Sequence, residues 1–144
     1  MLFRSSIYSS TVGGGAGNQA IDQFATVSGG STNTASAVQT FVGGGGNNTA
    51  SAIGSTVSGG QGNTASAINS TVGAGALNQA TEVFATISGG ASNEASGVNS
   101  AIGGGTTNEA SGQNTFIGGG GQNVASGLTS TISGGQGKIG RAHV

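Results

Sequence analysis

The sequence predicts an all-β fold, a single-stranded parallel β-solenoid (β-roll) of about nine rungs, and three regular features carry this prediction. A valine or isoleucine recurs every 15 residues, an asparagine keeps the same spacing, and an alanine follows each asparagine by two places. A short period without insertions indicates that each repeat is one small unit stacked on its neighbours. We therefore expect each repeat to form one turn of a rod.

Two columns of residues define the repeat. The aliphatic column, which we expect to form the structural core ladder, is Val12, Val27, Val42, Val57, Val72, Ile87, Ile102, Ile117 and Ile132. The asparagine column, which we expect to form a ladder of rung-to-rung hydrogen bonds, is Asn18, Asn33, Asn48, Asn63, Asn78, Asn93, Asn108 and Asn123. The alanine column runs in step with it from Ala20 to Ala125 and is expected to face inward.

The first strand of each repeat is predicted from alternation of aliphatic and polar residues. Branched aliphatics stand four places before the core ladder, with Ser, Ala or Thr midway between the two. A period of two is typical of a half-buried strand with its aliphatic residues on the packed side. We therefore expect this earlier set to face inward as well: Val38, Ile53, Ile68 and Val98.

The rest of the repeat predicts a bend and a second strand. A glycine pair such as Gly59-Gly60 follows nearly every first strand, and glycine reaches positive φ without a steric penalty. The segment Asn63-Thr64-Ala65-Ser66 then predicts a second short strand with its alanine inward, and asparagine also tolerates left-handed geometry. Rungs of this kind stack at ~4.8 Å, which places Val12 and Ile132 roughly 38 Å apart.

The composition alone would favour disorder, because glycine supplies 32 of 144 residues and charged residues only 5%. Stacking one motif in register can nevertheless give an ordered fold. Each rung is expected to bury only about two aliphatic side chains and an alanine, and a buried large side chain contributes ~1.5–3 kcal/mol, which is little against the entropy lost on ordering 15 residues. We therefore expect further burial by oligomerisation, with a homotrimer as the predicted assembly. The net charge of −1 predicts no nucleic-acid partner, and without cysteine no thiolate metal site is expected.

The two ends of the chain do not follow the repeat. Residues 1–5 and 139–144 resemble translated sequencing adapters, and we interpret both as non-native ends. The predicted β-solenoid head-repeat domain is then 6–138, an internal fragment of a longer protein. No apolar run reaches the ~18 residues of a membrane-spanning helix, so we expect no direct membrane insertion by this fragment.

One full repeat carries a family resemblance: Ser55-Thr56-Val57-Ser58-Gly59-Gly60-Gln61-Gly62-Asn63-Thr64-Ala65-Ser66. It resembles the head repeat of trimeric autotransporter adhesins, the YadA-like head, and related bacterial surface and tail-fibre repeats, over residues 6 to 138. The resemblance implies a left-handed parallel β-roll, a homotrimer, display on a bacterial cell surface through an outer-membrane anchor, and binding of an extracellular macromolecule. The adhesin repeat is usually one residue shorter and ends in Ala-Ile-Gly, whereas this repeat carries a glycine pair.

Two other functions remain open alongside the adhesin head. The same rod would serve as the shaft of a phage tail-fibre-like protein. An outward column of threonines is also what an ice-binding β-solenoid presents, although Phe and Ala interrupt this one: Thr11, Thr26, Phe41, Thr56, Thr71, Thr86, Ala101, Phe116 and Thr131.

Candidate sites are few, and we expect no enzymatic activity, cofactor or metal. Glu94 and Glu109 occupy the same position in adjacent rungs, at about the separation of a retaining glycosidase pair, but should lie on an open face. Asp22 and Glu82 share a column about 19 Å apart, too far to cooperate. The candidate contact surface is formed by aromatic residues that we expect to face outward: Phe24, Phe41, Phe84 and Phe116.

Overall fold

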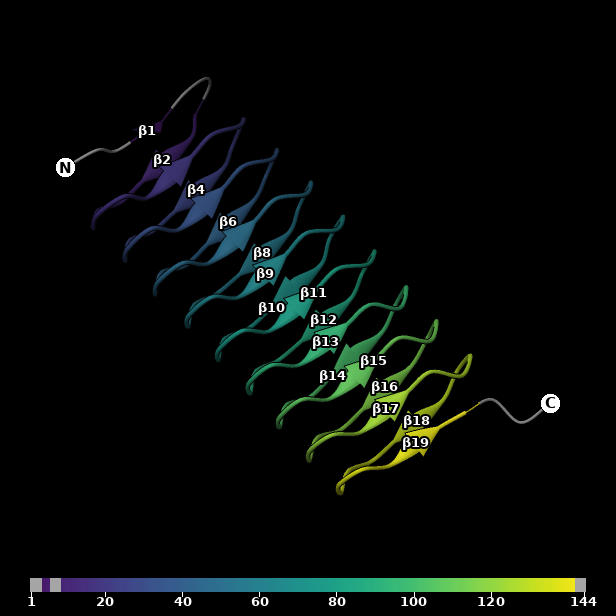
Figure 1. The fold of residues 1–144 in the computed structure, drawn as a ribbon. Helices are drawn as coiled ribbons and strands as arrows, with labels where there is room; N and C mark the ends of the chain where they lie inside the picture. Colours follow the sequence, from purple (N-terminus) through teal and green to yellow (C-terminus); the bar gives the residue numbers. More distant parts are fainter. Residues whose placement is uncertain (1–3, 6–8, 142–144) are drawn as a thin grey trace.

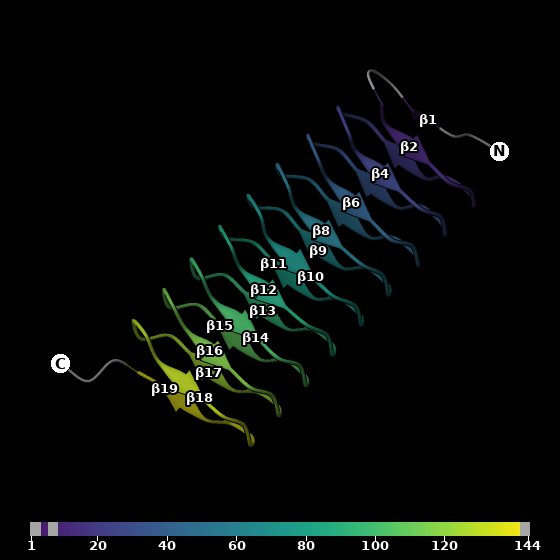
Figure 2. The same cartoon turned by 180° about the vertical axis from the view of Figure 1, so that it is seen from behind.

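The computed structural model describes residues 4–5 and 9–141, in which every strand has two residues and no helix occurs. The chain winds in about nine rungs that follow one another along a single axis, with the two ends of the chain at opposite ends of the rod (Figure 1). The view from behind shows the same succession of rungs (Figure 2). The predicted parallel β-solenoid with 15-residue rungs is confirmed.

Each rung contributes one strand to each of two parallel sheets. The odd-numbered sheet contains β1 (Arg4–Ser5), β3 (Gln19–Ala20), β5 (Thr34–Ala35), β7 (Thr49–Ala50), β9 (Thr64–Ala65), β11 (Gln79–Ala80), β13 (Glu94–Ala95), β15 (Glu109–Ala110), β17 (Val124–Ala125) and β19 (Ile139–Gly140). The even-numbered sheet contains β2 (Thr11–Val12), β4 (Thr26–Val27), β6 (Phe41–Val42), β8 (Thr56–Val57), β10 (Thr71–Val72), β12 (Thr86–Ile87), β14 (Ala101–Ile102), β16 (Phe116–Ile117) and β18 (Thr131–Ile132).

Strands pair in register with their equivalents one rung away. In the even-numbered sheet Thr71 lies opposite Thr86 and Val72 opposite Ile87, and the backbone nitrogen of Thr71 donates to the carbonyl of Ala85 at 2.9 Å. A third ladder of single bridges, such as Ala76 with Ala91, joins the rungs between the sheets. These bonds satisfy the backbone of a rung that has few side chains to bury.

The core lies between the two sheets and is narrow. From Val27 to Ile117 the aliphatic column is at most 1% exposed, Ile132 is 6% exposed, and Val12 at the first rung is partly buried. Opposite it stand the alanine column, from Ala20 to Ala125, and the fully buried asparagine column. Threonine and valine alternate outward and inward in the even-numbered strands, where β-branched residues suit a half-buried pleated surface.

The asparagine side chains bond along the rod and also close the chain bend beside them. Asn63 donates through Nδ2 to the carbonyls of Gly59 and Gly75, both at 2.9 Å, and its Oδ1 accepts the backbone nitrogen of Asn78 at 3.0 Å. The left-handed residue is not the asparagine of this ladder but the residue before it, such as Gly62 or Leu77. The buried asparagine side chains therefore satisfy backbone groups of the glycine bend and join each rung to the next.

One expectation for the first strand is wrong. Ile53 and Ile68 are 51% and 46% exposed, and Val38 and Val98 are only half-buried. The residue after each of them has a positive φ, as at Asn69 (54°), so the chain turns there and the strand alternation begins two places later than expected. The small residue that follows does face inward, as at Ser70, whose hydroxyl donates to the carbonyl of Ala67 at 2.7 Å.

Backbone pairing continues beyond residues 6–138. Arg4–Ser5 pairs with Gln19–Ala20, and Ile139–Gly140 pairs with Val124–Ala125. The non-native origin of residues 1–5 and 139–144 stays a prediction. Residues 1–3, 6–8 and 142–144 lie outside the described part of the chain.

Candidate interaction surfaces

The solenoid has two edges at which the chain passes from one sheet to the other. At the first, which we call the turn edge, residues such as Ala67, Ile68 and Asn69 connect β9 to β10. At the second, which we call the glycine edge, residues 73–78 connect β10 to β11. Both edges need left-handed residues, but they meet that need differently.

The glycine edge has no room for a side chain at its central position. Gly60 has a φ of 88°, and a Cβ there would overlap the carbonyl oxygen of Gly75 and lie 2.6 Å from Nδ2 of Asn63. The same overlap with the neighbouring rung recurs along the column, as at Gly90 and Gly105. Glycine is therefore required here by both conformation and space.

The turn edge carries most of the exposed apolar side chains. We define the apolar ridge as eight exposed or half-buried residues of this edge: Phe24, Val38, Ile53, Ile68, Val83, Phe84, Val98 and Leu128. Val38, Ile53, Ile68, Val83 and Val98 stand in successive rungs at ~4.8 Å steps, so the ridge is continuous through the middle of the rod. Contiguous apolar surface of this kind is typical of a contact site.

Two members of the ridge combine exposure with backbone strain. Phe24 and Phe84 are 51% and 54% exposed, and both have a φ of 58°. A left-handed conformation costs a non-glycine residue roughly 1–2 kcal/mol, and such residues concentrate at functional sites. Gly54, Asn69 and Asn99 hold the same position in other rungs, so phenylalanine is not required there by the fold.

The other two candidate phenylalanines lie on a sheet face instead of an edge. Phe41 and Phe116 point outward from the even-numbered sheet and are 37% and 45% exposed. Cε1 of Phe41 lies 3.3 Å from the point that a Cβ of Gly43 would occupy, so the ring leans along the strand over bare backbone. All four phenylalanines are exposed, but they belong to two different surfaces.

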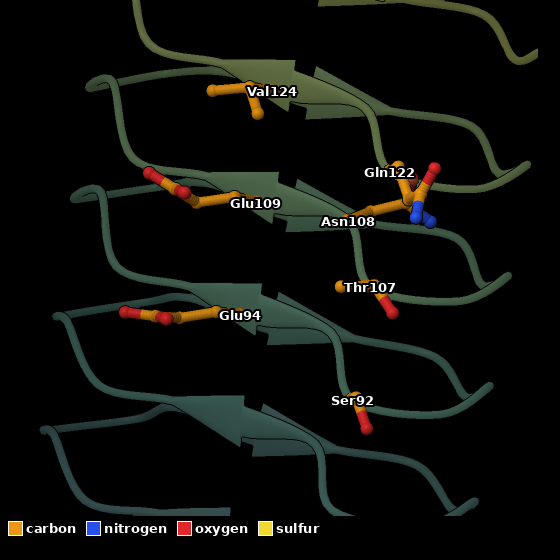
Figure 3. A pocket seen from close by; sticks show the side chains of 7 residues that line it. All are labelled: Ser92, Glu94, Thr107, Asn108, Glu109, Gln122 and Val124. Carbon is orange, nitrogen blue, oxygen red and sulfur yellow. The ribbon is translucent and has the colours of Figure 1, made fainter. Parts of the chain in front are cut away.

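The two stacked glutamates lie on the odd-numbered sheet. Glu94 and Glu109 are register partners in β13 and β15, and both are exposed. Figure 3 shows their side chains extending side by side in one direction, away from Thr107 and Ser92. They border a shallow pocket of about 380 Å³ lined by Ser92, Glu94, Thr107, Asn108, Glu109, Gln122 and Val124.

This arrangement does not bring catalytic or metal-ligating groups together. Two carboxylates that extend in parallel into solvent do not flank a bond, as a glycosidase pair must. No group of three or more His, Cys, Asp or Glu side chains in the described residues could hold a metal ion. Asp22 and Glu82 each accept a bond from the next backbone nitrogen, at 2.7 and 3.4 Å, as turn residues commonly do.

The comparisons with known proteins assign no family. No family model matches the chain, and no curated protein matches it significantly. In the described part of the chain, no helix is long and apolar enough to cross a membrane. The geometry of the surfaces is therefore the basis for a functional conclusion.

Proposed function

We propose that this chain is a non-enzymatic head module of a surface-displayed bacterial adhesin, a stiff rod that attaches through many weak contacts. The observation that carries the proposal is the apolar ridge on the turn edge, which includes Ile53, Ile68 and Phe84 and offers a surface through which copies of the chain would pack into the rod. In the resembling YadA-like heads a repetitive rod of parallel chains presents the adhesive surface.

The ridge supports assembly of parallel copies, for which we propose a homotrimer; the left-handed coil is what the resemblance implies. Each rung buries only one large aliphatic side chain, such as Val72, with one or two alanines. Covering a half-exposed Ile53 or Ile68 would add about 1 kcal/mol each. A second copy of the chain repeats its apolar side chains at the same ~4.8 Å step, so parallel ridges match in the successive middle rungs from Val38 to Val98.

With the ridges packed together, the two sheet faces of each chain remain for an extracellular ligand. Repeated copies of a weak site on a rigid rod raise the overall binding strength without any single strong contact. In the full-length protein the rod is placed outside the cell, anchored to the outer membrane, as the resemblance implies.

The adhesive function can be tested with beads coated at several densities with the purified chain. We expect retention under flow on collagen, laminin or fibronectin to rise more steeply than the coating density, because attachment is multivalent. The control is the chain with Val72→Asp, which buries a charge in the core and removes the folded rod. Retention on none of these proteins above the level of that control would contradict the proposal.

A further inference from the structure

The outer face of the even-numbered sheet combines flat aromatic groups with hydroxyl groups. Phe41 lies between Thr26 and Thr56, its register partners in the neighbouring rungs. Ser28 and Ser58 are exposed beside Gly43, the residue over which the ring leans. The ring is therefore surrounded by hydroxyl groups on the rungs before and after it.

The ring leans along its own strand. Cε1 of Phe41 lies 3.3 Å from the place of a Gly43 Cβ, so this part of the ring lies close to the strand two residues farther along. Phe116 leans over Gly118 in the same way, at 3.6 Å. Each ring therefore leans toward the glycine two residues later, where no side chain limits its approach, and stays partly exposed to solvent.

Among the described residues, this face carries no charge. Its outward positions hold only Thr, Phe and Ala, and the positions two residues later hold only Gly and Ser. The odd-numbered sheet differs, because Glu94 and Glu109 point outward from it. The chemistry of this face therefore suits a neutral ligand with an apolar surface for the ring and polar groups for the hydroxyls.

We propose that the Phe41 platform, with Thr26, Thr56, Ser28 and Ser58, binds a neutral pyranose unit of a polysaccharide. The C–H face of a sugar ring is electropositive and suits the negative face of phenylalanine, while its hydroxyls bond to the threonines and serines. The inference rests on the proposed function, because it names the ligand class of the adhesive face.

Phe116 repeats the platform farther along the same column. It lies roughly 24 Å from Phe41 along the axis, within reach of a single extended glycan chain. The equivalents of its four flanking hydroxyl residues are Ala101, Thr131, Gly103 and Ser133, so two hydroxyls are missing. Phe41 is therefore the stronger of the two platforms, and a long chain that engages both gains avidity.

The test uses the whole chain and two probes, cellohexaose and maltohexaose, with NMR shifts of the backbone amides of Thr26, Thr56 and Ser58 as the readout, because these residues remain in every variant. We expect at least one probe to shift these signals with millimolar affinity, and Phe41→Ala to weaken its binding about tenfold. Phe41→Tyr should retain binding. The matched control is Leu77→Ala, which removes an exposed apolar side chain from the glycine edge and should leave binding unchanged.

No shift with either sugar up to about 10 mM, or equal binding by the Phe41→Ala chain, would overturn the inference. Because Phe41 lies outside the core, its removal should lower the unfolding midpoint only modestly and leave the rod folded, so a loss of binding by the folded variant reports the platform itself. The bead assay separates the two proposals. Retention on matrix proteins without any sugar binding would reject the glycan platform and leave the adhesive rod intact.

Discussion

The glycine edge and the turn edge both reverse the chain with positive-φ residues, yet the central position of the first and the left-handed position of the second accept very different residues. The central position of the glycine edge is glycine from Gly15 to Gly135, whereas the left-handed position of the turn edge includes phenylalanine, glutamine, asparagine and threonine. At the glycine edge the neighbouring rung occupies the space of a side chain. At the turn edge the side chain projects into solvent. The fold therefore does not restrict the residue type, and the side chain can contact a partner.

The difference shows how a repetitive fold separates stability from recognition. Positions that touch the next rung repeat one residue type, because each rung imposes the same distances on the next. Positions that point away vary, and their variation is where a partner can be recognised. The apolar ridge belongs to the second group, as do Phe41 and Phe116.

The largest predicted effect compares one substitution at the two edges. Gly60→Ala should cost about 4 kcal/mol or more, because the new Cβ overlaps the backbone of Gly75. Gly54→Ala should cost only about 1 kcal/mol, because the overlapping atom is Oδ1 of Asn69, the mobile end of an exposed side chain. Urea unfolding followed by circular dichroism measures both, and equal losses would remove the distinction between the edges.

The next effect compares two asparagines. Asn63→Asp should cost about 3 kcal/mol, because it replaces the Nδ2 donor to Gly59 and Gly75 with a buried oxygen facing their carbonyls. Asn69→Asp on the exposed turn edge should change the unfolding free energy by less than about 0.5 kcal/mol. Thermal unfolding of both variants tests this, and a silent Asn63→Asp would show that the ladder contributes little.

A smaller effect concerns the hydroxyls inside the turn edge. The buried Oγ of Ser100 has no hydrogen-bond partner, whereas Oγ of Ser70 donates to the carbonyl of Ala67 at 2.7 Å. Ser100→Ala should therefore stabilise the chain by about 1 kcal/mol, and Ser70→Ala should destabilise it by a similar amount. Differential scanning calorimetry measures both changes in stability. A change of the same sign for the two variants would contradict the hydrogen bonding described.

The smallest effect is relief of backbone strain. Thr107 and Phe84 have φ values of 55° and 58°, so glycine at either position should stabilise a single chain by roughly 0.5–1 kcal/mol. Thr107→Gly should leave association unchanged, whereas Phe84→Gly should weaken it, because only Phe84 belongs to the apolar ridge. Unfolding curves of both variants measure the stability, and light scattering measures the association. Equal association of the Thr107→Gly and Phe84→Gly chains would place Phe84 outside the interface.

Much of the fold could be predicted because the repeat reports spacing directly. The 15-residue period and the core column around Val72 follow from counting along the chain. The position of Ile68 could not be predicted in the same way, because alternation alone does not show where a strand begins. The residue that follows each of these isoleucines could have indicated the turn, because asparagine at position 69 and glycine at position 54 favour positive φ.

The candidate surfaces were only partly predictable for the same reason. The outward direction of Phe41 follows from its place beside Val42, but the leaning of its ring over Gly43 depends on side-chain geometry. Because Ile53 and Ile68 were expected in the core, the ridge that they form with Phe24 and Phe84 was not foreseen. The contact role of the phenylalanines stays a prediction.

The measurement that tests the account most directly is sedimentation equilibrium of the whole chain and of an Ile53→Ser/Ile68→Ser variant. Leu77→Ser on the glycine edge is the matched control, because Leu77 is also exposed, at 60%, but lies outside the ridge. We expect three associated chains for the unaltered protein and for the control, and a folded monomer for the ridge variant. A folded monomer for the unaltered protein at all concentrations, or a ridge variant that still forms the trimer, would contradict the account.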